Sequence, residues 1–80
     1  MYVTATCPFC HSAERLLRQK GVDIETVRVD LDPARREEMM RKSGRRTVPQ
    51  IWIGERHVGG CDDLHALERE RALDPLLEAP

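Results

Sequence analysis

The chain has little of what would suit it to a membrane or a nucleic acid. No apolar run in its 80 residues approaches the roughly 20 residues that a membrane-spanning helix needs. Thirteen basic residues stand against fourteen acidic ones, and the formal net charge is -1. No large field of one sign can therefore attract a polyanion or a charged surface. The composition predicts neither a nucleic-acid nor a membrane partner.

Cysteines are also few. Three cysteines, an odd number, fit a disulfide-stapled scaffold poorly. The chain opens Met1-Tyr2-Val3-Thr4, without the basic and apolar segments of a secretory signal, so we expect a cytoplasmic protein. A structural disulfide would be reduced there. A reactive or metal-binding pair of cysteines is the better interpretation.

The sequence contains no linker, internal repeat or low-complexity segment, which predicts one domain over residues 1–80 and a monomer. Apolar periodicity and breakers predict an α/β chain in the order strand, helix, strand, helix, strand, strand, helix. The expected ranges are 1–3, 8–20 (with Gly21 just past the helix end), 24–31, 33–44, 50–53, 56–58 and a helix capped by Cys61 or Asp62, followed by a helical turn from Asp74. The first three elements form a βαβ unit with parallel strands, and the hairpin adds antiparallel strands to the same sheet.

Two segments carry expectations about packing. Val27, Val29 and Leu31 alternate with charged residues, which places them on one side of the strand 24–31. Met39 and Met40 give the following helix its only large apolar contacts, which is typical of a surface helix.

Cys7-Pro8-Phe9-Cys10 opens the first helix, where unpaired N–H groups and the helix dipole stabilise a thiolate. A Cys-x-x-Cys beside a βαβ pattern indicates a redox motif. Cys7 precedes the helix, so we expect it to be exposed and to attack a disulfide. Cys10 turns partly inward and would resolve the mixed disulfide that results. Pro8 stiffens the turn and disfavours a metal-binding geometry.

Three other interpretations of the cysteines remain open on the residues alone. The two thiols can be ordinary buried side chains. Zinc would need two further ligands, and the sequence offers no second Cys-x-x-Cys and no histidine pair at finger spacing. The candidates for those ligands are Cys61, His11, His57 and His65.

Haem is the third interpretation, because Cys7 to His11 also matches the c-type attachment signature Cys-x-x-Cys-His. Attachment of that kind usually needs export, a second axial ligand and apolar walls. Met39 or Met40 could ligate, but the chain has only three aromatic residues and no export signal.

Thr47-Val48-Pro49 is a second candidate segment. If the Val48–Pro49 bond is cis, the turn exposes the backbone N–H and C=O of Val48, and an extended peptide can pair with them. Only about 5–6% of such bonds are cis, so the bare sequence favours a trans proline at a strand start.

Gly59-Gly60-Cys61-Asp62-Asp63 is a third candidate. Two glycines before a helix allow close backbone approach, and the first N–H groups of the helix can bind a carboxylate. Asp62 can accept a hydrogen bond from a ligand ammonium. The simpler interpretation is a hairpin exit followed by a helix cap, with Cys61 as a small buried residue.

Together the three segments resemble the glutaredoxin family of the thioredoxin fold, most closely its short bacterial dithiol type. Phe9 stands where the family commonly has tyrosine, and Thr47-Val48-Pro49 matches the loop in which the family's proline is cis. The resemblance implies a thioredoxin-like fold, βαβαββα, with a four-stranded mixed sheet of order 2-1-3-4 flanked by helices.

The resemblance also implies glutathione as cosubstrate and no metal. Thr47 and Val48 would pair with the cysteinyl backbone of glutathione, Cys61 and Asp62 would hold its γ-glutamyl end, and Arg46 its glycyl carboxylate. The implied residues are Cys7 and Cys10 for catalysis, and Phe9, Arg46, Thr47, Val48, Pro49, Gly60, Cys61 and Asp62 for glutathione binding.

The expected activity is glutathione-dependent reduction of disulfides in proteins and of glutathione mixed disulfides. The family suggests ribonucleotide reductase or glutathionylated proteins as partners. One alternative is a redoxin reduced by thioredoxin reductase. Another is a module in which two copies hold an iron–sulfur cluster through Cys7 and glutathione, which Pro8 disfavours. The chain departs from the family at Thr4, where a lysine is common, and in its short first strand.

Overall fold

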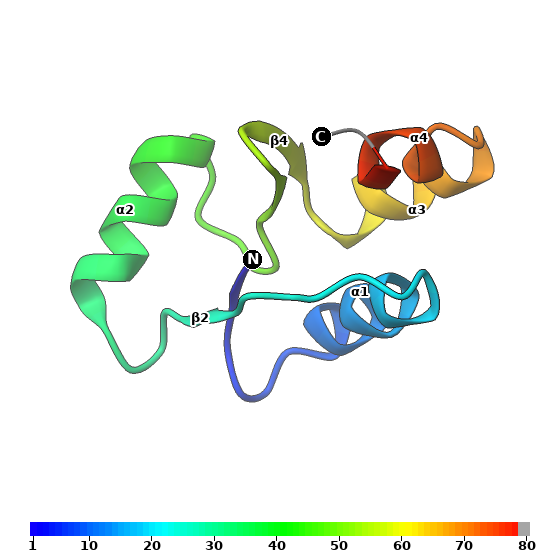
Figure 1. The fold of residues 1–80 in the computed structure, drawn as a ribbon. Helices are drawn as coiled ribbons and strands as arrows, with labels where there is room; N and C mark the ends of the chain where they lie inside the picture. The colour runs from blue at the N-terminus through cyan, green and yellow to red at the C-terminus, as the bar shows by residue number, and fades with distance from the viewer. Residues whose placement is uncertain (79–80) are drawn as a thin grey trace.

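Eight short elements follow one another in the order that the sequence predicts. The structure is a computed structural model that describes residues 1–78. The elements are β1 (Tyr2–Val3), α1 (Pro8–Gln19), β2 (Val27–Arg28), α2 (Pro33–Ser43), β3 (Ile51–Ile53), β4 (Arg56–Gly59), α3 (Cys61–Arg69) and α4 (Leu73–Glu78). In Figure 1, α2 lies on one side of the strands, and α1, α3 and α4 lie on the other.

The strands pair in two small sheets. β1 and β2 are parallel, with Tyr2 opposite Val27, as the βαβ unit requires. β3 and β4 form the expected antiparallel hairpin. A single antiparallel bridge links β1 to the residue before β3, because Tyr2 and Gln50 exchange backbone hydrogen bonds of 2.9 and 3.2 Å. A continuous four-stranded sheet of order 2-1-3-4 stays a prediction.

The second strand is much shorter than expected. Only Val27–Arg28 pairs with β1, whereas the sequence pattern predicted a strand over residues 24–31. The chain turns at residues 29–31 before the cap of α2, so the alternation of sides ends there. Val29 is buried whereas Leu31 is 72% exposed, so the prediction that these two residues share one side of a strand is wrong at Leu31.

Helix ends follow local sequence signals at α1 and α2. Pro8 is the first residue of α1. The Asp32 carboxylate caps α2 by accepting the backbone N–H groups of Ala34 and Arg35, and Gly44 ends the helix with a φ of 71°. The cap of α3 differs from the prediction. Gly60 occupies that position, because Cys61 and Asp62 are already helical.

The core lies on both sides of the strands. Leu16, Leu17, Ile51, Leu64 and Leu73 pack together where α1, α3 and α4 meet β3. Burial of each such side chain contributes about 1.5–3 kcal/mol. No helix in residues 1–78 combines the length and the apolar character needed to cross a membrane.

A second part of the core lies under α2, where Met39 packs on Tyr2 and Val29. Met39 is fully buried, so α2 is attached to the strands through a specific side chain and is less superficial than the sequence suggested.

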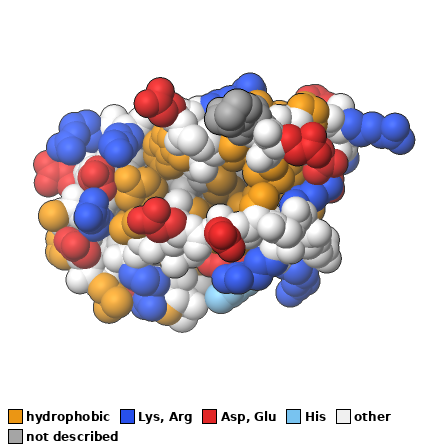
Figure 2. Space-filling view, viewed as in Figure 1, with side chains coloured by type: hydrophobic (Ala, Val, Ile, Leu, Met, Phe, Trp, Pro, Cys, Tyr) orange, Lys and Arg blue, Asp and Glu red, His pale blue; other side chains and the backbone are white. Residues whose placement is uncertain are grey.

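The face drawn in Figure 2 shows apolar side chains gathered in a hollow with charged residues around it. A hollow of about 480 Å³ there is lined by residues that include Leu17, Ile24, Ile51, Trp52 and Leu77. Its lining contains no cysteine or histidine, so the redox candidates lie elsewhere in the molecule.

Candidate functional site

The two cysteines of the Cys-x-x-Cys motif meet at the first turn of α1. Cys7 is the cap residue of the helix and Cys10 lies in its first turn, with 5.1 Å between their Cα atoms and a disulfide between their sulfur atoms. The backbone N–H of Cys10 donates a hydrogen bond of 3.0 Å to Cys7 Sγ. The sulfur of Cys7 therefore receives one of the helix donors that have no partner within the helix.

Both sulfurs lie deeper than the sequence suggested. Cys10 is 1% exposed, as an inward-facing resolving thiol requires, but Cys7 is only 6% exposed. Cys7 packs with Val3 and Val48 and is bonded to Cys10, and these neighbours cover it. The expectation of an exposed Cys7 is wrong for this oxidised form, although Cys7 remains the more accessible of the two.

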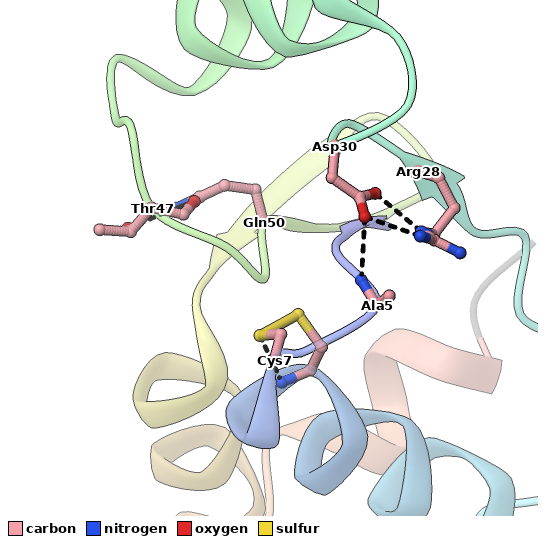
Figure 3. Close-up of a disulfide and its surroundings, with 7 residues drawn as sticks. Ala5, Cys7, Arg28, Asp30, Thr47 and Gln50 are labelled. Atoms are coloured by element: carbon pink, nitrogen blue, oxygen red, sulfur yellow. Dashed lines mark hydrogen bonds and ion pairs between the residues drawn. A yellow bond between two sulfur atoms is a disulfide. The ribbon is translucent and has the colours of Figure 1, made fainter.

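The loop before Cys7 is attached to the turn after β2. The Asp30 carboxylate accepts the Ala5 backbone N–H at 3.4 Å and two donors of the Arg28 guanidinium at 2.7 and 2.6 Å (Figure 3). The Arg28 hydrogen bonds are the main cause that lowers the pKa of Asp30 from 3.8 to about 2, and the Ala5 N–H adds to the effect. Asp30 therefore remains charged in the folded protein near neutral pH.

The proline loop, residues 47–49, lies beside the cysteines. Its Val48–Pro49 bond is cis, as the family resemblance implied, and the trans bond favoured by the bare sequence is wrong. Local frequencies cannot report the tertiary packing around this bond. Val48 packs on the cluster that contains Cys7 and Cys10, so the loop and the disulfide form one surface.

A groove of about 200 Å³ opens between the proline loop and the start of α3. Its lining comprises Phe9, Arg45, Thr47, Val48, Pro49, Gly60, Cys61, Asp62 and Asp63. Phe9 is 63% exposed and forms a wall next to the disulfide, whereas Cys61 is buried, as expected. The structure therefore gathers every residue of the predicted binding set except Arg46.

Two lining residues, Arg45 and Asp63, were missed by the sequence analysis. Arg45 Nη1 donates to Asp63 Oδ2 at 2.9 Å, and the same oxygen accepts the Gly60 N–H at 2.9 Å. The hydrogen bond from Arg45 is the main cause that lowers the pKa of Asp63, and the hydrogen bond from the Gly60 N–H adds to the effect. The available signal was the pair of adjacent arginines, Arg45-Arg46, and the pair of adjacent aspartates, Asp62-Asp63. The sequence does not say which residues of each pair line the groove.

The ligands that zinc would need lie apart. His57 lies on β4, where its ring contacts Gln50. His65 lies on α3, where its ring contacts Ser12 of α1. Within residues 1–78, no three side chains of histidine, cysteine, aspartate or glutamate come together in a way that could hold a metal ion. The described fold thus assembles no zinc ligand set around the third cysteine, Cys61.

Comparison with known proteins agrees with the fold and the motif. The family model described as Glutaredoxin matches residues 1–58. The chain is 60% identical over 79 residues to a glutaredoxin of Pseudomonas aeruginosa, covering 99% of this chain and 94% of that protein. It is 53% identical over 78 residues to glutaredoxin 3 of Escherichia coli, covering 98% and 94% respectively.

A solved structure supports the same relationship. The crystal structure of a buckwheat glutaredoxin–glutathione complex superposes with a TM-score of 0.88 at 30% identity, over 95% of this chain and 72% of the other. The motif, the fold and these matches together establish that the chain belongs to the glutaredoxin family of thiol–disulfide oxidoreductases, within the thioredoxin superfamily.

Proposed function

We propose that this protein is a glutathione-dependent thiol–disulfide oxidoreductase that reduces protein disulfides and glutathione mixed disulfides through Cys7 and Cys10. The observation that carries the proposal is the groove described above, which places the backbone of the proline loop and the first turn of α3 beside the Cys7–Cys10 pair. An extended peptide with a carboxylate at one end matches those two features.

In the proposed reaction, the Cys7 thiolate attacks one sulfur of a substrate disulfide. A Cys7–substrate disulfide forms, and the other substrate sulfur leaves as a thiolate that takes a proton. The Cys10 thiolate then attacks Cys7 Sγ, which releases the second substrate thiol and gives the Cys7–Cys10 disulfide. The hydrogen bond from the Cys10 N–H to Cys7 Sγ stabilises negative charge on Cys7 and favours it as the attacking group.

Glutathione would return the pair to its reduced form. One glutathione thiolate attacks Cys7 Sγ, forms a mixed disulfide and frees Cys10. A second glutathione attacks the glutathione sulfur of that mixed disulfide, so oxidised glutathione leaves and Cys7 is a thiol again. Two electrons pass from two glutathione molecules to one substrate disulfide, which balances the cycle.

The proposed contacts follow the lining of the groove. Thr47 and Val48 pair with the cysteinyl backbone of glutathione, and the first N–H groups of α3, at Cys61 and Asp62, receive its γ-glutamyl carboxylate. Phe9 covers the tripeptide from the side. Support comes from the buckwheat relative, whose structure is a complex with glutathione.

The remaining binding residues of the proposal are Pro49, Gly60 and Arg46. Pro49 and Gly60 are part of the lining, and they bring the backbone close to the ligand. Arg46 is exposed next to Thr47 and would reach the glycyl carboxylate from outside the groove.

The wider setting is also part of the proposal. Residues 1–80 would act as one monomeric domain in the cytoplasm, where glutathione keeps thiols reduced. Disulfide-containing or glutathionylated proteins, with ribonucleotide reductase as one candidate, would be the substrates. No metal has a role in this reaction.

Turnover of hydroxyethyl disulfide with glutathione, glutathione reductase and NADPH tests the proposal. Cys7→Ser should abolish all activity, because no attacking thiol remains. Cys10→Ser should keep reduction of the glutathione mixed disulfide and lose reduction of protein disulfides such as those of insulin. If the unmodified protein reduces disulfides when thioredoxin reductase supplies the electrons but not when glutathione does, the reductant is thioredoxin reductase and the glutathione proposal fails.

The alternative of an iron–sulfur module has its own test. Anaerobic reconstitution with iron, sulfide and glutathione should leave a colourless monomer. A brown dimer whose colour depends on Cys7 would show that the protein holds a cluster.

A further inference from the structure

Gln50 is a buried polar side chain that joins the proline loop to β4. Its exposed fraction is 0%. The amide Nε2 donates to the Thr47 carbonyl oxygen at 3.0 Å and to Thr47 Oγ1 at 3.3 Å. On its other side, Oε1 lies 2.8 Å from His57 Nε2. Figure 3 shows the Gln50 side chain reaching across the loop toward Thr47, with the disulfide below the tip of the loop.

These contacts determine where the hydrogen of the imidazole lies. The Thr47 carbonyl can only accept, so the NH₂ end of the Gln50 amide must face it. The amide oxygen then faces His57, and it can only accept as well. His57 Nε2 therefore carries a hydrogen and donates it to Gln50, which leaves each polar atom of this buried amide with a partner.

His57 is itself held by the aromatic side chains of the strands. Its ring lies on Trp52, with 4.5 Å between ring centroids and 32° between planes, and the two residues are opposite each other in the β3–β4 pairing. Trp52 in turn meets Tyr2 of β1 edge to face, with 5.4 Å between the two ring centroids. The imidazole is thus fixed by a cross-strand contact before it reaches Gln50.

We propose that Gln50 and His57 are positioning residues that fix the Thr47 carbonyl and thereby the shape of the proline loop in the groove. This inference rests on the proposed function, in which the Thr47 and Val48 backbone pairs with glutathione. A loop held in its binding shape loses little conformational freedom when the ligand arrives, whereas a loose loop must be ordered at the expense of affinity. Neither side chain belongs to the lining of the groove, and their side-chain hydrogen bonds go to Thr47 and to each other, not to Cys7 or Cys10.

Two substitutions separate the two ends of this connection. Gln50→Met keeps the length and removes the amide, and His57→Phe keeps a ring on Trp52 but removes the donor. His65→Phe is the matched control, because it removes another half-buried histidine whose one side-chain partner is Ser12, outside the groove. Steady-state kinetics with the mixed disulfide of glutathione and 2-mercaptoethanol gives KM and kcat for each variant.

We expect KM to rise about fivefold in Gln50→Met and in His57→Phe, the size of one net hydrogen bond, with kcat within about twofold. His65→Phe should leave both parameters unchanged. The double variant should raise KM no more than Gln50→Met alone, because His57 acts through Gln50. Additive effects, or a fall in kcat at unchanged KM, would overturn the inference.

An independent measurement avoids glutathione altogether. The ¹³C resonance of the Thr47 carbonyl reports the hydrogen bond that it accepts, and it should shift in Gln50→Met and His57→Phe but not in His65→Phe. Should the unmodified protein fail to turn over glutathione substrates, the proposed function fails while this resonance still tests the connection. An unshifted resonance in a folded Gln50→Met would overturn the inference by itself, and His57→Phe serves the same purpose if Gln50→Met does not fold.

Discussion

Arg45 and Asp63 both line the groove, with Nη1 of the arginine 2.9 Å from Oδ2 of the aspartate. The contact joins the segment before the proline loop to the first turn of α3. Both side chains are about half exposed, so the pair contributes little to stability, at most about 1 kcal/mol. Its consequence is electrostatic, because a positive charge is held in a groove that also contains two carboxylates.

Replacement of Arg45 should change both the groove and the titration of Asp63. In Arg45→Gln, we expect the pKa of Asp63 to move up toward its usual value, because its main stabilising contact is lost. We also expect weaker binding of glutathione, by about two- to fivefold, because the ligand carries a net negative charge. Carboxyl ¹³C titration and calorimetry measure the two effects.

Arg46→Gln is the matched control for Arg45→Gln. Arg46 carries the same charge one position along the chain but does not belong to the lining of the groove. It should leave the Asp63 titration unchanged and weaken glutathione binding less than Arg45→Gln does. A weakening by Arg46→Gln equal to or greater than that by Arg45→Gln would show that the proposed Arg46 contact outweighs the charge held inside the groove, and would contradict this prediction.

Gly59→Ala should destabilise the protein strongly. The residue has a φ of 116°, in the region that favours glycine, and an added Cβ would overlap the Asp63 carboxylate. We expect a loss of at least about 2 kcal/mol in the free energy of unfolding, measured with urea. Gly44→Ala, with a φ of 71° and open space around the added Cβ, should cost only about 1 kcal/mol. Equal losses would exclude the contact with Asp63 as a cause.

Asp30→Asn should change how stability depends on pH at the acid end. The pKa of Asp30 is lowered from 3.8 to about 2 in the folded protein, chiefly by Arg28, so its charged form stabilises the native state. That contribution is fully present above the unfolded pKa and is lost as the pH falls through the folded one. The stability difference between the unmodified protein and Asp30→Asn should therefore be constant above about pH 5 and shrink toward pH 2. Urea unfolding across this range measures it, and a constant difference down to pH 2 would contradict the assignment.

Met39→Ala should loosen α2 from the strands. Met39 is fully buried against Tyr2 and Val29, so its truncation removes apolar contacts and leaves a cavity. A loss of about 2–4 kcal/mol is expected in urea unfolding. Met40→Ala, at the half-buried neighbouring position, should cost clearly less. A similar cost at both positions would mean that α2 does not pack through Met39.

The order of elements and the place of the cysteine pair could be predicted from the sequence, because both depend on local rules. Pro8 starts a helix where a missing N–H costs nothing, and Gly44 ends one in a left-handed conformation. Strand length was predicted poorly. Apolar and charged residues alternate as far as Leu31, but the chain already turns at residues 29–31, and this turn leaves no mark on the alternation.

The binding groove depended on a resemblance and on tertiary structure. Motif matching identified most of its lining but not Arg45, whereas Arg46, which the family motif suggested, lies outside the lining, and its role stays a prediction. These two arginines are equivalent in every local property of the chain. Only Asp63, 18 positions further along, distinguishes them, and its distance in space is not encoded in the local pattern.

The sequence by itself determined the chemistry of this protein, a Cys7-Pro8-Phe9-Cys10 motif at a helix start, because the helix dipole and the spacing of two thiols are local properties. Tertiary structure alone decided the burial of Cys7 under Val48 and the connection from His57 through Gln50 to the proline loop. Those contacts join segments that lie apart in the sequence or that no periodic pattern relates to each other. They form only once the strands and helices have packed.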